Sequence, residues 1–196
     1  MRNQFNSTVK KAEKIIATND LGAIKVLLDE LGRNDEQACV SNADVLYQIG
    51  SKVPELIEMH AKTIINHLKT KSVKLRLRYM DILLTIVHLQ HGCIWSNMNE
   101  ICDYMISDSE ALVNKLTALI IELSSYSEYK KECSYALLAL LEVCSSSHAV
   151  TYEESMNLEY MNLNTRNMLK NSLLRYYDMF TPDQQKKITN LLERLG

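Results

Sequence analysis

Residues that interrupt helices are scarce in this sequence: five Gly and two Pro occur among 196 residues. Long stretches therefore contain no helix breaker, which favours helices and argues against a β architecture rich in turns. The hydrophobic content of 46% and the charged content of 23% are ordinary for a globular protein and suffice for a sizeable core. The length fits one domain, or one domain and a fraction.

Paired cysteines are missing too. The five Cys form an odd number and no CxxC motif occurs, which predicts free thiols in a reducing compartment. The first residues, MRNQFNSTVKK, lack the apolar segment of a secretory signal, and the longest apolar stretch, near residues 116–123, is too short to cross a bilayer. We therefore expect a cytoplasmic protein without membrane association.

Motifs of catalysis and cofactor binding are also absent from the sequence. It contains no Gly-rich phosphate loop, GxSxG, HExxH or dinucleotide-binding fingerprint. His88, His91 and Cys93 form the one group with metal-ligand residue types, but no second pair of ligands lies nearby, whereas structural zinc normally takes four. The sequence therefore favours a non-catalytic protein, with neither a cofactor nor a metal.

What the sequence does contain is a repeat of 37 residues. Residues 34–70, 71–107 and 108–144 superpose without gaps, here called repeats one, two and three. Hydrophobic residues recur at equivalent positions, and their spacing places them on one face of a helix. The matching columns are Ala38–Leu75–Leu112, Val45–Ile82–Leu119, Leu46–Leu83–Ile120, Ile49–Ile86–Leu123, Ala61–Met98–Tyr135, Ile64–Ile101–Leu138 and Ile65–Cys102–Ala139.

Each repeat is therefore predicted to be two antiparallel helices. Upstream, residues 5–17 and 21–32 are expected to form the helices of an incomplete unit, about residues 1–33, because Ile24, Leu27, Leu28 and Leu31 fall in the same columns. Acidic residues at helix starts, such as Asp35, suit the helix dipole. Breaks between helices are expected at Gly50–Pro54, at His91-Gly92 and at Ser124–Ser127.

Residues 145–196 depart from the 37-residue register and are expected to form a helical cap within the same domain. One helix is predicted over residues 164–180, with Met168, Leu169, Leu173, Tyr176 and Tyr177 facing inward. Thr181-Pro182-Asp183-Gln184 predicts the start of the last helix, with Thr181 as its N-cap. The apolar stripe of that helix is Ile188, Leu191, Leu192 and Leu195.

Two-helix units of this length in tandem, with Pro54 near the start of a second helix, resemble HEAT or armadillo-type repeats. The resemblance covers about residues 5–144. It implies an all-α, right-handed α-solenoid, or α-α superhelix, of stacked antiparallel helix pairs over residues 1–144. It also implies a scaffold or adaptor, since such arrays usually hold a partner protein in a concave face.

On this resemblance, the second helix of each pair lines the concave face. Two polar ladders recur there at intervals of 37 residues, and they mix positive, negative and neutral side chains. They are the natural place for a partner to bind, but mixed charge is also typical of any solvated helix face. The ladders are Lys25, Lys62 and Asn99, and Asp29, Asn66 and Asp103.

A basic run, KTKSVKLRLR at residues 69–78, opens repeat two. Lys71, Lys74 and Arg78 form one stripe of a helix, and Arg76 points elsewhere. Neighbouring repeats keep only Lys115 basic in these columns, so the fold does not require the charges. The stripe is either a solvated edge or a docking patch for an acidic partner or phosphate.

Trp95, the only tryptophan, occupies a column that holds Glu58 and Glu132 in the other repeats. This predicts an exposed position at a helix start and an interface anchor. The alternative is that the ring packs over the adjacent loop, because large aromatic side chains usually find cover.

The sequence therefore favours a protein–protein interaction scaffold. The alternative is a HEAT-like protein that binds nucleic acid, because alkylpurine DNA glycosylases are built from similar repeats. In that alternative Trp95 and Asp103 would serve the chemistry, but no cluster of aromatic and basic residues surrounds them in the sequence. A pI near 6.2 argues against nucleic-acid binding by the whole chain, and no aromatic residue outside a core column interleaves the basic run to stack bases.

Overall fold

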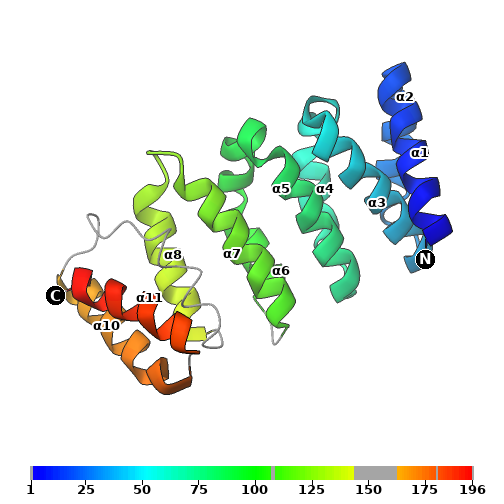
Figure 1. The fold of residues 1–196 in the computed structure, drawn as a ribbon. Helices are drawn as coiled ribbons and strands as arrows, with labels where there is room; N and C mark the ends of the chain where they lie inside the picture. The colour runs from blue at the N-terminus through cyan, green and yellow to red at the C-terminus, as the bar shows by residue number, and fades with distance from the viewer. Residues whose placement is uncertain (1, 107–108, 144–162, 180, 196) are drawn as a thin grey trace. The chain divides into compact units, whose positions relative to one another are not determined.

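All regular elements of the described chain are helices. The computed structural model describes residues 2–106, 109–143, 163–179 and 181–195, and the predicted all-α class is confirmed over these ranges (Figure 1). The chain divides into two compact units, Met1–Leu116 and Thr117–Gly196, and the boundary falls inside helix α7. The first part of the predicted cap, residues 145–162, lies outside the described residues.

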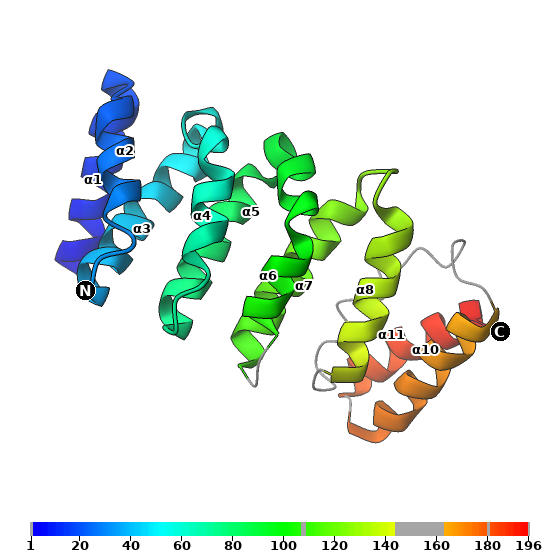
Figure 2. The ribbon, with the colours of Figure 1, turned by 180° about the vertical axis from the view of Figure 1, so that it is seen from behind.

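The first compact unit contains the helices predicted for the incomplete unit and for repeats one and two. Helices α1, α3 and α5 pack in series, and α4 packs against α5. Figures 1 and 2 show these helices following one another in chain order. The elements are α1 (Arg2–Thr18), α2 (Leu21–Asp29), α3 (Glu36–Lys52), α4 (Ala61–His67), α5 (Val73–Ser96), α6 (Met98–Met105) and the first part of α7 (Glu110–Ser124).

Short polar side chains begin three of these helices. Asp20 Oδ1 accepts a hydrogen bond from the Ala23 N–H at 2.8 Å, and Asp35 Oδ1 accepts one from Ala38 at 3.1 Å. Ser72 Oγ serves α5 in the same way. These bonds satisfy N–H groups that have no partner inside the helix. The helix start predicted at Asp35 is thereby confirmed.

The break predicted at Ser124–Ser127 is confirmed, because α7 ends at Ser124 and the next helix begins at Lys130. The other two predicted breaks occur in altered form. After α3, two 3₁₀ turns, Pro54–Leu56 and Glu58–His60, precede α4, so Pro54 opens a 3₁₀ turn instead of the α-helix. The break expected at His91-Gly92 is a kink at Gln90, with φ −123° and ψ 27°, after which α5 continues to Ser96. His91 and Gly92 each have a backbone N–H, which a proline would lack, so the helix can continue after the kink.

Three hydrophobic columns are buried in all three repeats. These are the columns of Val45, Leu46 and Ile49, and each of their nine members is at most 1% exposed. The other columns hold less strictly, because Ala38 in the first turn of α3 is exposed and Tyr135 is 37% exposed. The side chains of Leu138 and Ala139 lie outside the described residues. The repeat therefore forms its core mainly through the middle of each first helix.

The turn after α2 is held by buried polar groups of later helices. The Tyr79 hydroxyl of α5 donates a hydrogen bond to the Leu31 carbonyl at 2.8 Å. The Cys39 thiol of α3 lies 3.3 Å from the Arg33 carbonyl oxygen, within hydrogen-bonding distance. Each of these bonds joins the incomplete first unit to a following repeat. Tyr79 is 1% exposed, so its hydroxyl needs this partner, whereas the thiol of Cys39, at 0% exposed, is a weak donor.

His67 packs in the same region. Its half-buried ring lies 5.8 Å, centroid to centroid, from the Tyr79 ring. A Cβ at Gly32 would lie 3.2 Å from His67 Cε1, so the turn passes close to the imidazole. Burial lowers the pKa of His67 below its ordinary value of 6.5.

We expect the stability of the protein to fall as the pH drops below about 6.5. The unfolded chain binds a proton at His67 near its ordinary pKa, whereas the folded chain binds it only at lower pH, so stability is complete above 6.5 and decreases down to the folded pKa. Urea unfolding between pH 7.5 and pH 5.5 measures this slope. Burial lowers the pKa of His60 as well, so His67→Gln is expected to reduce the slope without abolishing it. A slope equal to that of the wild type would contradict the assignment.

The second compact unit contains the rest of α7, α8 (Lys130–Val143), α10 (Leu163–Tyr176), a 3₁₀ turn (Tyr177–Met179) and α11 (Pro182–Leu195). Helices α10 and α11 pack against each other. Thr181 Oγ1 accepts from the Gln184 N–H at 3.4 Å, and Gln184 Oε1 accepts from the Thr181 N–H at 2.9 Å. This reciprocal cap confirms the predicted start of the last helix.

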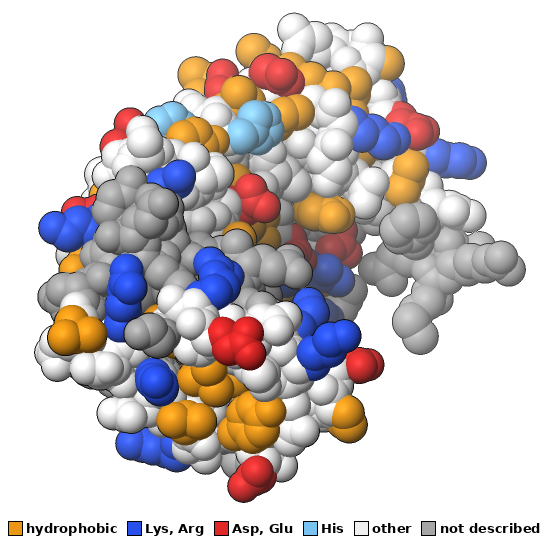
Figure 3. Space-filling view, turned by 60° about the vertical axis from the view of Figure 1, so that its left-hand side comes forward, with side chains coloured by type: hydrophobic (Ala, Val, Ile, Leu, Met, Phe, Trp, Pro, Cys, Tyr) orange, Lys and Arg blue, Asp and Glu red, His pale blue; other side chains and the backbone are white. Residues whose placement is uncertain are grey.

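The apolar stripes predicted for this unit are largely buried. Leu169, Leu173, Ile188, Leu191 and Leu195 are at most 6% exposed. Leu192 and Tyr177 are half-buried, and the side chains of Met168 and Tyr176 lie outside the described residues. Figure 3 shows basic, acidic and hydrophobic side chains mixed on the face that it presents.

Candidate functional site

The second helices of the first compact unit expose both predicted polar ladders. All six residues lie on the surface of α2, α4 and α6, two to each helix. We call this set the second-helix surface. Its members are Lys25, Asp29, Lys62, Asn66, Asn99 and Asp103.

Lys62 joins two of these helices. Its Nζ lies 3.0 Å from Glu100 Oε2 and also contacts Asn97 Oδ1, so α4 is tied to the beginning of α6. Lys69 adds a second cation, 3.4 Å from the other carboxylate oxygen of Glu100. The hydrogen bond from Lys62, assisted by Lys69, lowers the pKa of Glu100. Lys62 therefore has a structural role in addition to any role in binding.

Asn66, Asn99 and Asp103 differ from Lys62 in this respect. In the described part of the chain, these three exposed side chains form no hydrogen bond and no ion pair. Their polar atoms face solvent, so a partner that contacts them breaks no internal interaction. They are the most accessible members of the second-helix surface.

Arg76, a candidate from the basic run, is occupied by backbone carbonyls. Its Nε donates to the Thr70 oxygen at 2.6 Å and its Nη1 donates to the Tyr104 oxygen at 2.8 Å. The guanidinium therefore joins the start of α5 to the last turn of α6. A half-buried arginine used in this way fixes the helix pair, with two of its five N–H donors engaged.

Arg78 belongs to a series of ion pairs along the first helices. Its Nε lies 3.0 Å from Asp44 Oδ1 on α3, and its Nη1 lies 3.4 Å from Asp81 Oδ2. Lys115 on α7 contacts the other oxygen of Asp81. Asp44 and Asp81 share one repeat column, and Arg78 and Lys115 share another. We call these four residues the first-helix ion ladder.

Sequence reasoning missed this ladder, although the signal was present. The cation of each repeat contacts the acid of the preceding repeat, and both pairs are separated by 34 residues. Comparing charged columns instead of hydrophobic ones would have found it. Burial raises the pKa of Asp44, while the charges of Arg78 and Lys74 oppose that shift. Side chains that are 43% and 36% exposed form a pair worth about 0–1 kcal/mol, so the Arg78–Asp44 contact adds little stability.

A hollow of about 500 Å³ lies beside the ladder, inside the first compact unit. We call it the α5–α7 hollow. The repeat columns show how it arises: Ala111 replaces Lys74 of repeat two, and Asn114 replaces Leu77. Its lining consists of Lys74, Leu77, Arg78 and Asp81 from α5, with Ala111, Asn114 and Lys115 from α7.

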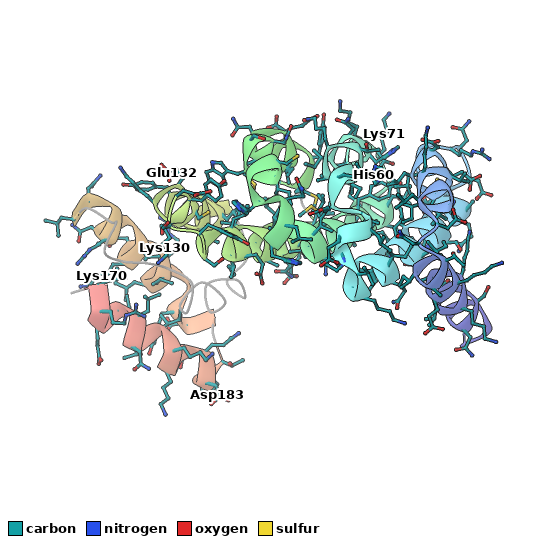
Figure 4. All side chains as sticks on the ribbon, turned by 90° about the horizontal axis from the view of Figure 1, so that it is seen from above. His60, Lys71, Lys130, Glu132, Lys170 and Asp183 are labelled. Atoms are coloured by element: carbon teal, nitrogen blue, oxygen red, sulfur yellow. The ribbon has the colours of Figure 1, made fainter. Side chains whose placement is uncertain are left out.

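Two further lysines of the basic run are exposed. Lys71 precedes α5 and lies at the outer edge of the first compact unit in Figure 4. Lys74 lies in the first turn of α5. Neither ammonium group has a hydrogen bond or ion pair with the described residues. Of the predicted stripe, the structure thus leaves Lys71 and Lys74 accessible and pairs Arg78.

Trp95 is half-buried and lies in the last turn of α5, beyond the kink, instead of at an exposed helix start. Its position is therefore intermediate between the two interpretations of the sequence. Part of the indole surface is buried by the protein, and the rest is exposed to solvent.

Neither a metal-binding cluster nor a membrane-spanning helix is found in the described ranges. No three His, Cys, Asp or Glu side chains there are grouped so that they could hold a metal ion. None of the described helices combines the length and hydrophobicity needed to traverse a lipid bilayer.

Comparison of the sequence with protein-family models and with curated proteins finds no match.

Proposed function

We propose that the chain is a non-catalytic scaffold or adaptor that binds another protein on a surface of stacked helical repeats. The architecture in this proposal is a right-handed α-solenoid of the HEAT or armadillo type, with the cytoplasm as its location. The packing of α1, α3 and α5 in series supports it, as do the buried columns that recur every 37 residues.

The second-helix surface carries the proposal. It presents equivalent positions of three successive second helices to solvent, and Asn66, Asn99 and Asp103 are exposed without internal partners among the described residues. A row of this kind can contact an extended partner at regular intervals, because the helices beneath it are fixed by their cores. Contacts such as Lys62–Glu100 keep neighbouring helices aligned, so the surface is preorganised.

The alternative of nucleic-acid binding is weakened by how the basic residues are used. Arg76 donates to backbone carbonyls, and Arg78 and Lys115 are paired with aspartates. Nucleic-acid affinity depends on cations that are available to phosphates. Two available lysines in the basic run, Lys71 and Lys74, provide little of that interaction.

Site-specific photocrosslinking in the native cell tests the proposal. A photoreactive phenylalanine derivative placed at Asn66 or at Asn99 is expected to give the same crosslinked partner. The matched control is Tyr47, an exposed aromatic position on the first helix α3, which is expected to give none. Crosslinking of unrelated species from all three positions, or of none from Asn66 and Asn99, would refute the second-helix surface as the binding site.

A further inference from the structure

The α5–α7 hollow is a local departure from the repeat. Two repeat columns show this. Lys74 and Leu77 on α5 are equivalent to Gln37 and Val40 on α3. On α7 the same two columns hold the shorter Ala111 and the polar Asn114. Ala111 and Asn114 are both exposed, so neither contributes to the core.

The hollow carries an excess of positive charge. Lys74, Arg78 and Lys115 line it, and Asp81 is the acid among the lining residues. Asp81 and Asp44 are bound by Arg78 and Lys115 in the ladder, which leaves Lys74 as the cation without an ion pair among the described residues. Lys74 also lies in the first turn of α5, where the helix dipole disfavours a cation and favours an incoming anion.

Apolar surface lies next to this charge. Leu77 is half-buried and contributes side-chain carbons to the hollow, and the Ala111 methyl group faces it from α7. A ligand that matches both features carries a carboxylate and an aliphatic group close together. A peptide with an acidic residue beside a hydrophobic one has this chemistry.

A polyanion fits the hollow poorly. Lys74 is the one cation of the lining without an ion pair among the described residues, and Asp81 and Asp44 lie near it. These two carboxylates repel a continuous row of phosphates. Among the residues that the structure describes, no aromatic side chain lines the hollow to stack a base. These features favour a protein ligand over a nucleic acid.

We propose that the α5–α7 hollow binds an acidic segment of a partner protein, with a carboxylate on Lys74 and a neighbouring aliphatic side chain against Leu77 and Ala111. This deepens the proposed function, on which it rests for the kind of partner, and it adds a second contact surface on the first helices.

Selection from a library of random short peptides on the full chain tests this inference. Enrichment of peptides with Asp or Glu beside an aliphatic residue is the expected result. For an enriched peptide, Lys74→Ala is expected to weaken binding about fivefold to tenfold, as for the loss of one charged contact at an interface. Ala111→Phe, which fills the hollow from an exposed position without altering charge, is expected to abolish binding.

Lys71→Ala is the matched control, because it removes the same charge beside the start of the same helix but outside the hollow. Its expected effect is less than twofold. The inference is overturned if no acidic peptide is enriched, if Lys71→Ala weakens binding as much as Lys74→Ala, or if a duplex oligonucleotide competes for the hollow more strongly than the peptide.

The two proposals fail separately. Crosslinking at Asn66 and Asn99 reports on the second-helix surface, and peptide selection reports on the hollow. Loss of the first result leaves peptide binding at Lys74 intact, and loss of the second leaves the crosslinks intact.

Discussion

Replacing Leu83 with Ala is expected to lower the free energy of unfolding by about 2–5 kcal/mol. The side chain is 0% exposed and lies in the middle of α5, which packs against both α3 and α4. Truncation removes buried carbon atoms and leaves a cavity that the surrounding helices fill only in part. Urea unfolding followed by circular dichroism measures the loss.

The matched control for Leu83→Ala is Leu21→Ala, the same chemical change at a side chain that is 52% exposed. Its effect is expected to stay within about 0.5 kcal/mol. Leu46→Ala, in the same repeat column as Leu83 and equally buried, is expected to match the larger loss. If Leu46 and Leu83 behaved like Leu21, the buried columns would not form the core of the repeat.

Gly50→Ala is expected to cost about 1–3 kcal/mol of stability, the range for overpacking a core. Gly50 is a buried residue near the end of α3, where the chain passes close to α5. A Cβ there would overlap Thr85 Oγ1 and lie 2.7 Å from Ile57 Cδ1. Helix propensity alone would favour Ala by up to about 1 kcal/mol, so a loss isolates the steric cost.

A double-mutant cycle tests the origin of that loss. Thr85→Ala removes the overlapping hydroxyl, so Gly50→Ala is expected to cost less in this background than in the wild type. The contact with Ile57 remains, and the recovery is therefore incomplete. Gly22→Ala is the comparison at a less crowded position, where a Cβ would lie 3.3 Å from one side-chain atom, Asp20 Oδ1. Equal effects at Gly50 and Gly22 would contradict close packing of α3 on α5.

The helices and the centre of the core follow from hydrophobic spacing. The columns of Val45, Leu46 and Ile49 recur at a constant interval, and all their members are buried, because burial of one helix face is the largest favourable term in folding. The capping box at Thr181 was equally readable, since it depends on residues that are neighbours in sequence. Local and periodic features were therefore predictable.

The use of polar side chains was less predictable. Arg76 reaches the carbonyl of Tyr104, 28 residues away, and Lys62 reaches Glu100 on another helix. Long flexible side chains choose among partners according to the tertiary arrangement, which a one-dimensional pattern does not contain. Trp95 is half-buried for a similar reason: α5 resumes beyond Gln90 and carries the indole into its last turn.

The first-helix ion ladder has a consequence for how the length of this chain can change. Asp44 contacts Arg78, and Asp81 contacts Lys115, across the same interval of 34 residues. Excision of residues 45–81 would bring Asp44 and Lys115 to that interval, with the apolar columns still in phase. Because every repeat junction of this kind pairs an aspartate with a cation in the same columns, a whole helix pair can be gained or lost by duplication or deletion. The repeats that become neighbours then form the same aspartate–cation contact.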